Sequence, residues 1–190
     1  AVFVSTEDEE TGQVARDAGA RIIPRPSELS AGHVPKVEVL RHADGWLYET
    51  EHCHPHSMMC VQANSPEVLA RDLHEAIRML QQHKLWEVTS VGENNVQNGA
   101  FRLIRQHSLY NTFLSAHLGV VATDYLDIHT ENDLESLNAR YDDGSAFHER
   151  VAADRKWAST SQENLDGELA TTLDDYAISR VLYFWIYEQL

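Results

Sequence analysis

The chain is poor in cysteine, in basic residues and in long apolar runs, and each shortage excludes a class of protein. Its two cysteines, Cys53 and Cys60, are too few for a disulfide framework, so a reducing cytoplasm is the simplest setting. Fifteen basic against thirty acidic residues give a formal charge of −15. Such a chain lacks the basic face that nucleic acids and anionic membranes attract. The longest apolar run, residues 181–187, is far too short to span a bilayer, and we expect a soluble protein.

What is present fits one α/β domain with an appendage. Hydrophobic residues make up 43% of the 190 residues, enough for a sizeable core. Apolar runs alternate with segments of helical spacing, which predicts a three-layer α/β fold with a mostly parallel sheet and helices on both faces. The predicted strands are residues 2–4, 22–23, 57–62, 87–91, 100–104, 119–122 and 125–128, and the predicted helices are residues 7–18, 33–50, 65–80, 130–137 and 174–190.

Two parts are expected along the chain. Residues 1–141 should form the α/β domain, and residues 142–190 a polar linker followed by the C-terminal helix. That helix is apolar on nearly every side, which predicts that it packs against protein on both sides. Gly45 is expected to interrupt the helix over 33–50.

Local signals predict where several helices begin and end. Thr6 and Ser65 are suitable N-caps, since each precedes acidic residues or proline in a first turn. Thr130 and Asp133 have the spacing of a capping box. Gly19 stands where a left-handed residue would end the first helix.

Several strings resemble, in the same order, the motifs of the acylneuraminate cytidylyltransferase family. V-S-T-E-D-E at residues 4–9 and R-P-S-E-L at 25–29 resemble V-S-T-D-(D/S)-E and R-P-x-E-L. M-C-V-Q-A-N-S-P at 59–66 is similar to the family turn L-L-Q-P-T-S-P-L-R. N-G-A at 98–100 and D-I-H-T-E-N-D at 127–133 are similar to N-G-A-I-Y and D-I-D-T-x-x-D. The bland alternative is an ordinary strand–helix unit of any α/β domain.

The resemblance implies a nucleotide-diphospho-sugar transferase-like fold and the transfer of CMP from CTP to a sialic-type sugar acid, for cell-surface glycan synthesis. A hydroxyl of the sugar acid would attack the α-phosphate of CTP, and pyrophosphate would leave. Gln62 and Asp127 would then act in catalysis. The substrate-binding residues would be Gln62, Asn64, Ser65 and Asn98, and the nucleotide side would be formed by Ser5 and Thr6.

The resemblance also implies a metal site. Asp127 and His129 stand where the family has two Mg²⁺-binding aspartates. On a strand, residues two apart lie on one face, so both side chains could reach one ion. Mg²⁺ suits the Asp127 carboxylate, whereas His129 is better tolerated by Mn²⁺ or zinc. The alternative for Asp127 is a strand-end carboxylate bonded to a loop.

The chain departs from the family in two places. It lacks the Gly-rich, Lys-containing loop that grips the triphosphate, and Glu67 and Val68 replace the Leu-Arg of the Ser-Pro turn. Its first residue lies well inside the family pattern, so we expect a missing N-terminal segment. We also expect weak CTP binding, unless Arg21 and Arg25 form a substitute loop. The alternative function is a non-catalytic relative that serves as a binding or assembly module.

Two further features are weighed in the same way. His52, Cys53, His54 and His56 offer four soft-metal ligands in five residues, but no second ligand pair lies nearby, so a solvated loop is preferred to a zinc site. The resemblance implies a homodimer through residues 94–117, and the all-round apolar C-terminal helix indicates the same. The alternative is that this helix covers a sheet edge left open by the missing N-terminal strand.

Overall fold

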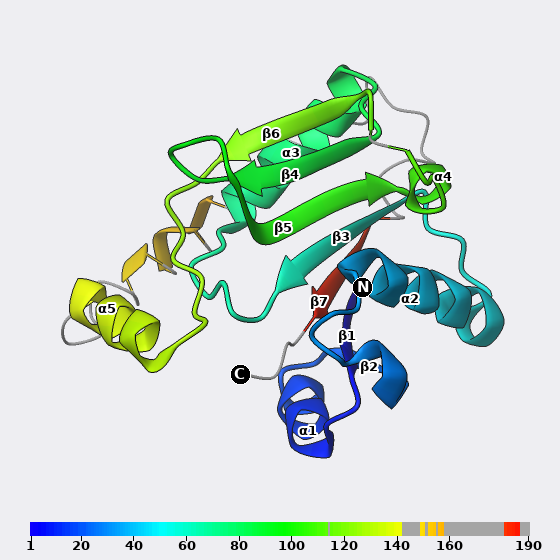
Figure 1. Ribbon diagram of the computed structural model, residues 1–190, viewed down its shortest axis with the longest axis horizontal. Helices are drawn as coiled ribbons and strands as arrows, with labels where there is room; N and C mark the ends of the chain where they lie inside the picture. The colour runs from blue at the N-terminus through cyan, green and yellow to red at the C-terminus, as the bar shows by residue number, and fades with distance from the viewer. Residues whose placement is uncertain (114, 142–148, 151, 155, 158–180, 187–190) are drawn as a thin grey trace.

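Seven strands pair in one sheet of the computed structural model, in the order β2-β1-β7-β3-β5-β4-β6 (Figure 1). The structure describes residues 1–113, 115–141, 149–150, 152–154, 156–157 and 181–186, and they form a mixed α/β protein. The strands are β1 (Val2–Thr6), β2 (Arg21–Pro24), β3 (Ser57–Gln62), β4 (Glu87–Val91), β5 (Gln97–Arg105), β6 (Leu118–Ala122) and β7 (Val181–Ile186). The helices are α1 (Glu9–Asp17), η1 (Ser27–Leu29), α2 (Lys36–Glu51), α3 (Ala70–Gln82), α4 (Gln106–Leu109) and α5 (Glu131–Tyr141).

The sheet is mostly parallel, with β5 as the exception. The pairs β1–β2, β1–β7, β3–β7 and β4–β6 are parallel. β5 runs antiparallel to both β3 and β4. The link from β4 to β5 is short and turns at Asn95, whose φ is 57°, with Gly92 N donating to Val96 O at 2.9 Å. Such a short connection joins antiparallel strands, whereas a parallel pair needs a long crossover.

The C-terminal segment differs most from expectation. Its described part, residues 181–186, is strand β7 between β1 and β3, so the predicted helix is wrong there. The remaining residues of that prediction, 174–180 and 187–190, lie outside the described residues. A parallel strand inside a sheet is covered on both faces and reads as a continuous apolar run. This explains the all-round apolarity, which therefore no longer indicates an interface.

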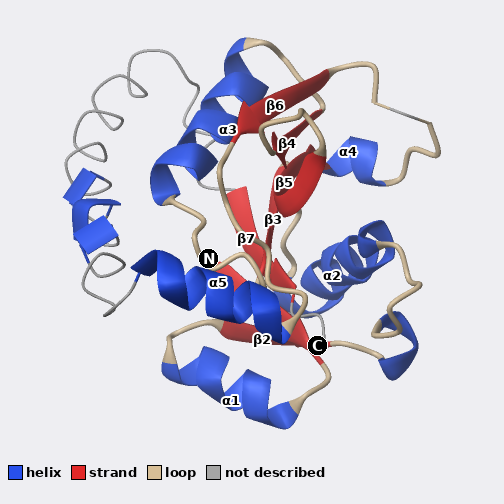
Figure 2. Cartoon of the chain, turned by 60° about the vertical axis from the view of Figure 1, so that its left-hand side comes forward, coloured by secondary structure: helices blue, strands red, loops and turns tan. Residues whose placement is uncertain are grey.

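Alternate residues of β3 pack against different helices. Met58 and Cys60 belong to the core cluster that contains Leu40 and Leu47 of α2. Met59 and Val61 belong to the cluster that contains Ala76 and Leu80 of α3. Because successive side chains of a strand point to opposite faces, α2 and α3 cover opposite sides of the sheet, as Figure 2 shows.

The first helix begins later than its sequence signal indicates. Asp8, not Thr6, caps α1, with Thr11 N donating to Asp8 Oδ2 at 2.7 Å. Thr6 Oγ1 instead accepts a hydrogen bond from Asp8 N at 3.1 Å. Gly19 has φ +85°, which confirms the predicted left-handed residue after the helix. Thr6 therefore holds the turn between β1 and α1.

The third helix also begins late and is capped from a distance. Residues 65–69 are not helical, and the residue before α3, Leu69, provides no side-chain cap, so the Ser65 prediction is wrong. Asp154 caps the helix instead: its carboxylate accepts hydrogen bonds from Ala70 N at 2.8 Å and from Arg71 N at 3.3 Å. Gly45 does not interrupt α2, which is continuous.

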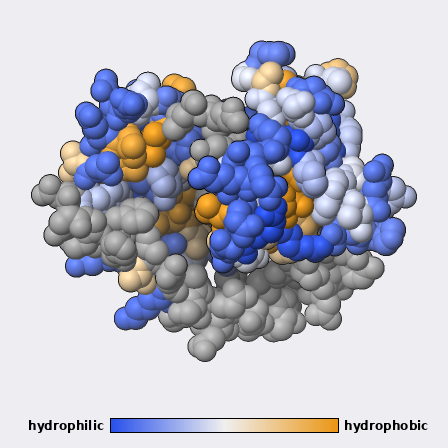
Figure 3. Space-filling model, turned by 90° about the horizontal axis from the view of Figure 1, so that it is seen from below, coloured by the Kyte–Doolittle hydropathy of each residue, from blue (hydrophilic) through white to orange (hydrophobic). Residues whose placement is uncertain are grey.

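The polar outer surface fits the composition. Seen from the side of α1, the described surface is largely hydrophilic (Figure 3), in keeping with the formal charge of −15. Among the described helices, none combines the length and the apolarity needed to cross a membrane.

Candidate functional site

The predicted site residues gather at one end of the sheet, here called the carboxyl edge: the end at which β1, β7 and β3 finish with Thr6, Ile186 and Gln62. Ser5 and Gln62 both pair with Ile186 from opposite sides, so they lie in one row. Two strand spacings, about 10 Å, separate them. Ser5 lies on the same face of the sheet as Phe3, and Gln62 lies on the same face as Cys60. Phe3 and Cys60 both belong to the core cluster that contains residues of α2.

Ser5 and Thr6 differ in how their hydroxyls are used. Ser5 is 1% exposed, and its hydroxyl makes no hydrogen bond within the part of the chain that the structure describes. Thr6 points to the other face, toward Gly12 of α1, and supports the following turn. Its carbonyl also accepts from Arg25 N at 3.1 Å. Of the two, Ser5 is the polar group without a structural task.

The loops after β3 and β6 are joined beside this row. Ser65 Oγ donates to Asp127 Oδ1. Ile128 N donates to Asn64 O at 2.9 Å, and Asn64 Nδ2 donates back to Ile128 O at 3.3 Å. Burial raises the pKa of the Asp127 carboxyl, against the opposing effects of Ser65 and of nearby positive charge. Asn64, Ser65 and Asp127 are thus brought together, as expected.

A lysine that the sequence analysis missed lies at the same place. Gln62 Nε2 donates to the carbonyl of Gly99, whose φ is +75°. A Cβ at Gly99 would lie 2.6 Å from Gln62 Nε2 and 3.6 Å from Lys36 Nζ. The charge of Lys36 also acts to lower the pKa of Asp127. Lys36 therefore lies beside Gly99, near enough to Asp127 for its charge to act there. Its sequence signal was a cation in the first turn of a helix, where the helix dipole disfavours one.

Asn98 lies next to the cluster, but its amide is occupied by internal bonds. Asn98 Nδ2 donates to Thr123 Oγ1 at 2.7 Å. Its Oδ1 accepts from Ser90 Oγ at 2.5 Å and from Ala100 N at 3.3 Å. These bonds tie β4 and β5 to the loop after β6. In this conformation Asn98 positions Gly99 rather than presenting its own amide.

The structure removes one geometric reason for a metal site at Asp127 and His129. Residues 125–128 are not a strand, so the predicted same-face spacing of Asp127 and His129 is wrong. His129 is exposed, and its backbone N donates to Asp133 Oδ2 at 3.0 Å. Asp133 also accepts from Thr130 N at 2.8 Å, while Asp133 N donates to Thr130 Oγ1 at 3.3 Å, which confirms the capping box. Burial raises the pKa of Asp127, and His129 is near enough to oppose that rise.

The search for larger metal sites covers the described residues only. Among them, no group of three or more His, Cys, Asp or Glu side chains is arranged to hold an ion. A pair such as Asp127 and His129 falls below that size, and Mg²⁺ takes only one or two carboxylates when phosphates complete its shell. In the histidine-rich loop, His52, His54 and His56 are exposed and Cys53 packs against the α2 core, which favours the solvated loop.

Neither Arg21 nor Arg25, the predicted substitutes for the phosphate-binding loop, is arranged to bind a triphosphate. Arg21 pairs with Glu51 and lies at the amino end of β2, opposite Phe3, away from the carboxyl edge. Arg25 lies at the edge, but its side chain is buried and donates to Glu7 at 2.8 Å. Hydrogen bonds from Ser30 and Arg25 lower the pKa of Glu7 despite the opposing effect of burial. Both arginines are engaged in ion pairs.

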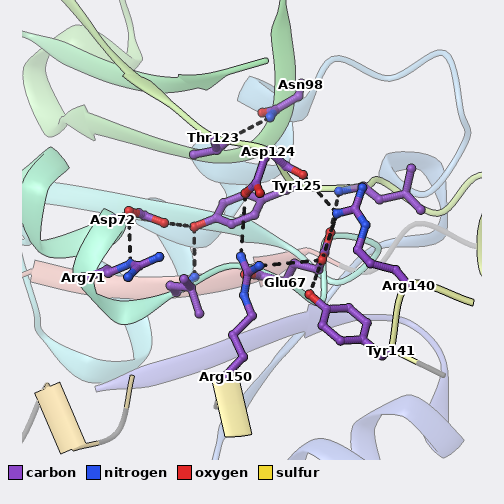
Figure 4. A network of polar contacts seen from close by, with 12 residues as sticks. Glu67, Arg71, Asp72, Asn98, Thr123, Asp124, Tyr125, Arg140, Tyr141 and Arg150 are labelled. Carbon is purple, nitrogen blue, oxygen red and sulfur yellow. Dashed lines mark hydrogen bonds and ion pairs between the residues drawn. The ribbon is translucent and has the colours of Figure 1, made fainter. Parts of the chain in front are cut away.

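Glu67 is the second residue that sequence reasoning missed, and it anchors the loops of the site (Figure 4). Its side chain is 0% exposed. It accepts from Leu126 N at 2.7 Å, from Arg140 Nη1 at 2.9 Å, and from the hydroxyl of Tyr141. Arg140 Nη1 also donates to Asp124 O at 3.1 Å. One carboxylate thus joins the loop after β3, the loop after β6 and α5.

A second set of contacts continues the network toward α3. The hydroxyl of Tyr125 donates to Asp72 and accepts from Leu69 N at 3.1 Å. Burial is the largest cause of a strongly raised pKa at Tyr125, followed by the hydrogen bond to Asp72. The guanidinium of Arg150 lies 5.9 Å from the Tyr125 ring. The segment that carries Asp127 is therefore fixed on both sides.

Comparison with models of known protein families and with curated protein sequences gives no match. The residues of the carboxyl edge and their contacts are therefore what supports a function for the chain.

Proposed function

We propose that the chain is a cytidylyltransferase-like domain that transfers CMP from CTP to a sialic-type sugar acid, on a three-layer scaffold of the nucleotide-diphospho-sugar transferase type. One observation carries the proposal: Ser65 and Asp127, 62 residues apart in the sequence, are hydrogen-bonded beside Gln62 at the carboxyl edge. In open α/β sheets, ligands bind outside the carboxyl ends of the strands. The segments with the family resemblance therefore meet where a ligand would bind.

Each residue has a role in this proposal. Gln62, held by the Gly99 carbonyl, would orient the sugar acid, and Ser5 and Thr6 would lie on the nucleotide side. Asp127, supported by Ser65 and with His129 nearby, fits a Mg²⁺ or Mn²⁺ ion that shares phosphate oxygens, because these ions accept one or two carboxylates. That ion would neutralise charge on the phosphates. Positioning and charge neutralisation carry most of the barrier reduction in phosphoryl transfer.

The acceptor hydroxyl would form a bond to the α-phosphorus as the bond to pyrophosphate breaks. Release of pyrophosphate from CTP, in the presence of Mg²⁺ and N-acetylneuraminic acid, tests the proposal. The Asp127→Asn variant should lose transfer and keep the fold. Glu131→Gln is the matched control, because Glu131 is an exposed acid in the first turn of the adjacent helix. Transfer by Asp127→Asn at the wild-type rate would refute the role of Asp127.

A specific observation favours the second candidate, a non-catalytic binding or assembly module. Glu67, which replaces an apolar family residue, serves an internal network, and Arg21 and Arg25 are paired with acids. Weak or undetectable CTP binding by residues 1–190 follows from this. Calorimetry that gives micromolar CTP affinity with Mg²⁺ would contradict it. Sugar-acid binding without pyrophosphate release would select the binding module.

We further propose a cytoplasmic homodimer. Val96, Tyr110 and Phe113 are exposed within the expected interface segment 94–117, and Phe113 is 86% exposed. No disulfide joins Cys53 and Cys60, which fits a reducing compartment. Sedimentation of the wild type against Phe113→Ser tests the dimer, since the substitution leaves the core intact. A wild type that stays monomeric at tens of micromolar, roughly where a standard interface is populated, would end this part of the proposal.

A further inference from the structure

The position of Lys36 is costly for the helix that carries it. Lys36 is the first residue of α2, and the preceding Pro35 gives no side-chain cap. A cation in a first turn opposes the helix dipole. Local conflicts of this kind concentrate at functional sites. The side chain of Lys36 reaches Gly99 at the carboxyl edge.

The surroundings of Lys36 are those of a site for a hydroxylated acid. Its ammonium lies 3.6 Å from the place that a Cβ of Gly99 would take, beside the amide of Gln62. The carboxylate of Asp127 is near enough for the charge of Lys36 to act on it. The buried Ser5 hydroxyl lies in the same row as Gln62 but two strand spacings away, on the nucleotide side. One cation therefore stands near two groups, Gln62 and Asp127, that accept hydrogen bonds from hydroxyls.

We propose that Lys36 binds the carboxylate of the acceptor, while Gln62 and Asp127 accept hydrogen bonds from its hydroxyls. This inference rests on the proposed function, and it assigns the recognition of the acid group to a residue outside the resembling motifs. A chain with a formal charge of −15 repels anions, so a local cation is needed for an anionic acceptor.

Gly99 is part of the same arrangement. Its φ of +75° favours glycine, and any side chain there would collide with Gln62. The missing Cβ lets the Gln62 amide and the Lys36 ammonium approach one backbone segment from the same side. The cation and the amide therefore lie on the same side of Gly99, where the carboxylate and a hydroxyl of one ligand would meet them in this proposal.

Calorimetry of the chain with N-acetylneuraminic acid and with its methyl ester tests the proposal. The wild type should bind the acid more tightly than the uncharged ester. Lys36→Met should weaken binding of the acid by about tenfold or more, the scale of one charge-assisted hydrogen bond, and leave the ester unaffected. Lys36→Arg should retain most of the preference for the acid. Lys84→Met, at an exposed residue after α3, is the matched control and should change nothing.

The outcomes separate this inference from the proposed function. Equal binding of the acid by the wild type and Lys36→Met would overturn the role of Lys36, while Asp127-dependent pyrophosphate release would still support the transferase. Equal affinity of the wild type for acid and ester would overturn it as well. Binding of neither compound would overturn both proposals. Thermal unfolding shows whether Lys36→Met is folded, and it should be at least as stable as the wild type because the unfavourable dipole contact is removed.

Discussion

Replacing Glu67 tests whether its buried carboxylate holds the loops of the carboxyl edge together. Glu67→Ala leaves the backbone N–H of Leu126 and the hydroxyl of Tyr141 without their acceptor. Each lost hydrogen bond to a charged group costs about 1.5–3 kcal/mol. The ion pair with Arg140 contributes less than a fully buried pair would, because the Arg140 side chain is 42% exposed and regains part of its hydration. We therefore expect the free energy of unfolding to fall by about 3–5 kcal/mol, the range for breaking a buried pair.

Urea unfolding at neutral pH, followed by circular dichroism, measures this loss. The slope m should stay constant, because the same surface is exposed on unfolding. Glu131→Ala is the control: it removes an exposed acid from the first turn of α5 and should cost less than about 1 kcal/mol. Glu67→Gln keeps one acceptor oxygen and should lose less than Glu67→Ala. A loss below about 1 kcal/mol for Glu67→Ala, typical of a surface site, would refute the reasoning.

A double variant separates the charge of Glu67 from its volume. Glu67→Leu alone leaves Arg140 beside an apolar side chain, so it should be about as unstable as Glu67→Ala. Combining it with Arg140→Met removes both charges and should recover part of the loss, since buried pairs are replaceable by apolar groups of similar size. Additive losses in the double variant would show that the two side chains do not interact.

Two further predictions follow from other parts of the structure. Gly99→Ala should lower the free energy of unfolding, measured in urea, more than Gly19→Ala does. Both glycines have positive φ, a conformation that costs an L-residue about 1–2 kcal/mol. Only at Gly99 does the new Cβ also meet a side chain, at 2.6 Å. Burial and the hydrogen bond to Asp44 raise the pKa of Tyr110 from 10.0 to about 12. Between pH 10 and about 12 the folded state keeps the proton of Tyr110, whereas the unfolded state loses it. The stability that the neutral Tyr110 hydroxyl gives the folded state is therefore complete below pH 10 and is lost as the pH rises through about 12. Tyr110→Phe should flatten that alkaline fall in stability, and ultraviolet titration of tyrosinate should show one fewer late-titrating group; an unchanged titration would contradict the assignment.

Strands with a distinct buried pattern were predictable from the sequence. β3 and β4 have the predicted bounds, because β3 is a short, mostly apolar run and β4 a short stretch with the β-branched residues Val88, Thr89 and Val91. β7 was predicted as part of a helix. An apolar run without periodicity fits a buried helix as well as a buried strand. Only its pairing with β1 and β3 decides between the two. The antiparallel direction of β5 was available from the short link before it, but was not inferred.

The candidate site was predictable only where its residues belong to ordered motifs. Ser65 and Asp127 were expected together, and the structure joins them by a hydrogen bond. Lys36 and Glu67 belong to no motif, and their roles come from contacts with residues distant in the sequence. The two loops that carry Glu67 and Leu126 lie 59 residues apart along the chain. Spacing within a segment cannot reveal such a pairing, because it forms only when the sheet brings the loops to one end.

The place of β7 also limits which ligands fit the carboxyl edge. Because β7 lies between β1 and β3, about 10 Å separates the Ser5 side of the edge from the Gln62 side. A single sugar ring is too small to contact both sides, whereas a nucleotide joined through phosphate to a sugar acid spans such a distance. In the proposed arrangement the nucleotide lies toward Ser5, the acid lies toward Lys36 and Gln62, and the phosphate lies over the end of β7. The separation set by the central strand thus leaves room for the two substrates of the proposed transfer to lie side by side along the edge.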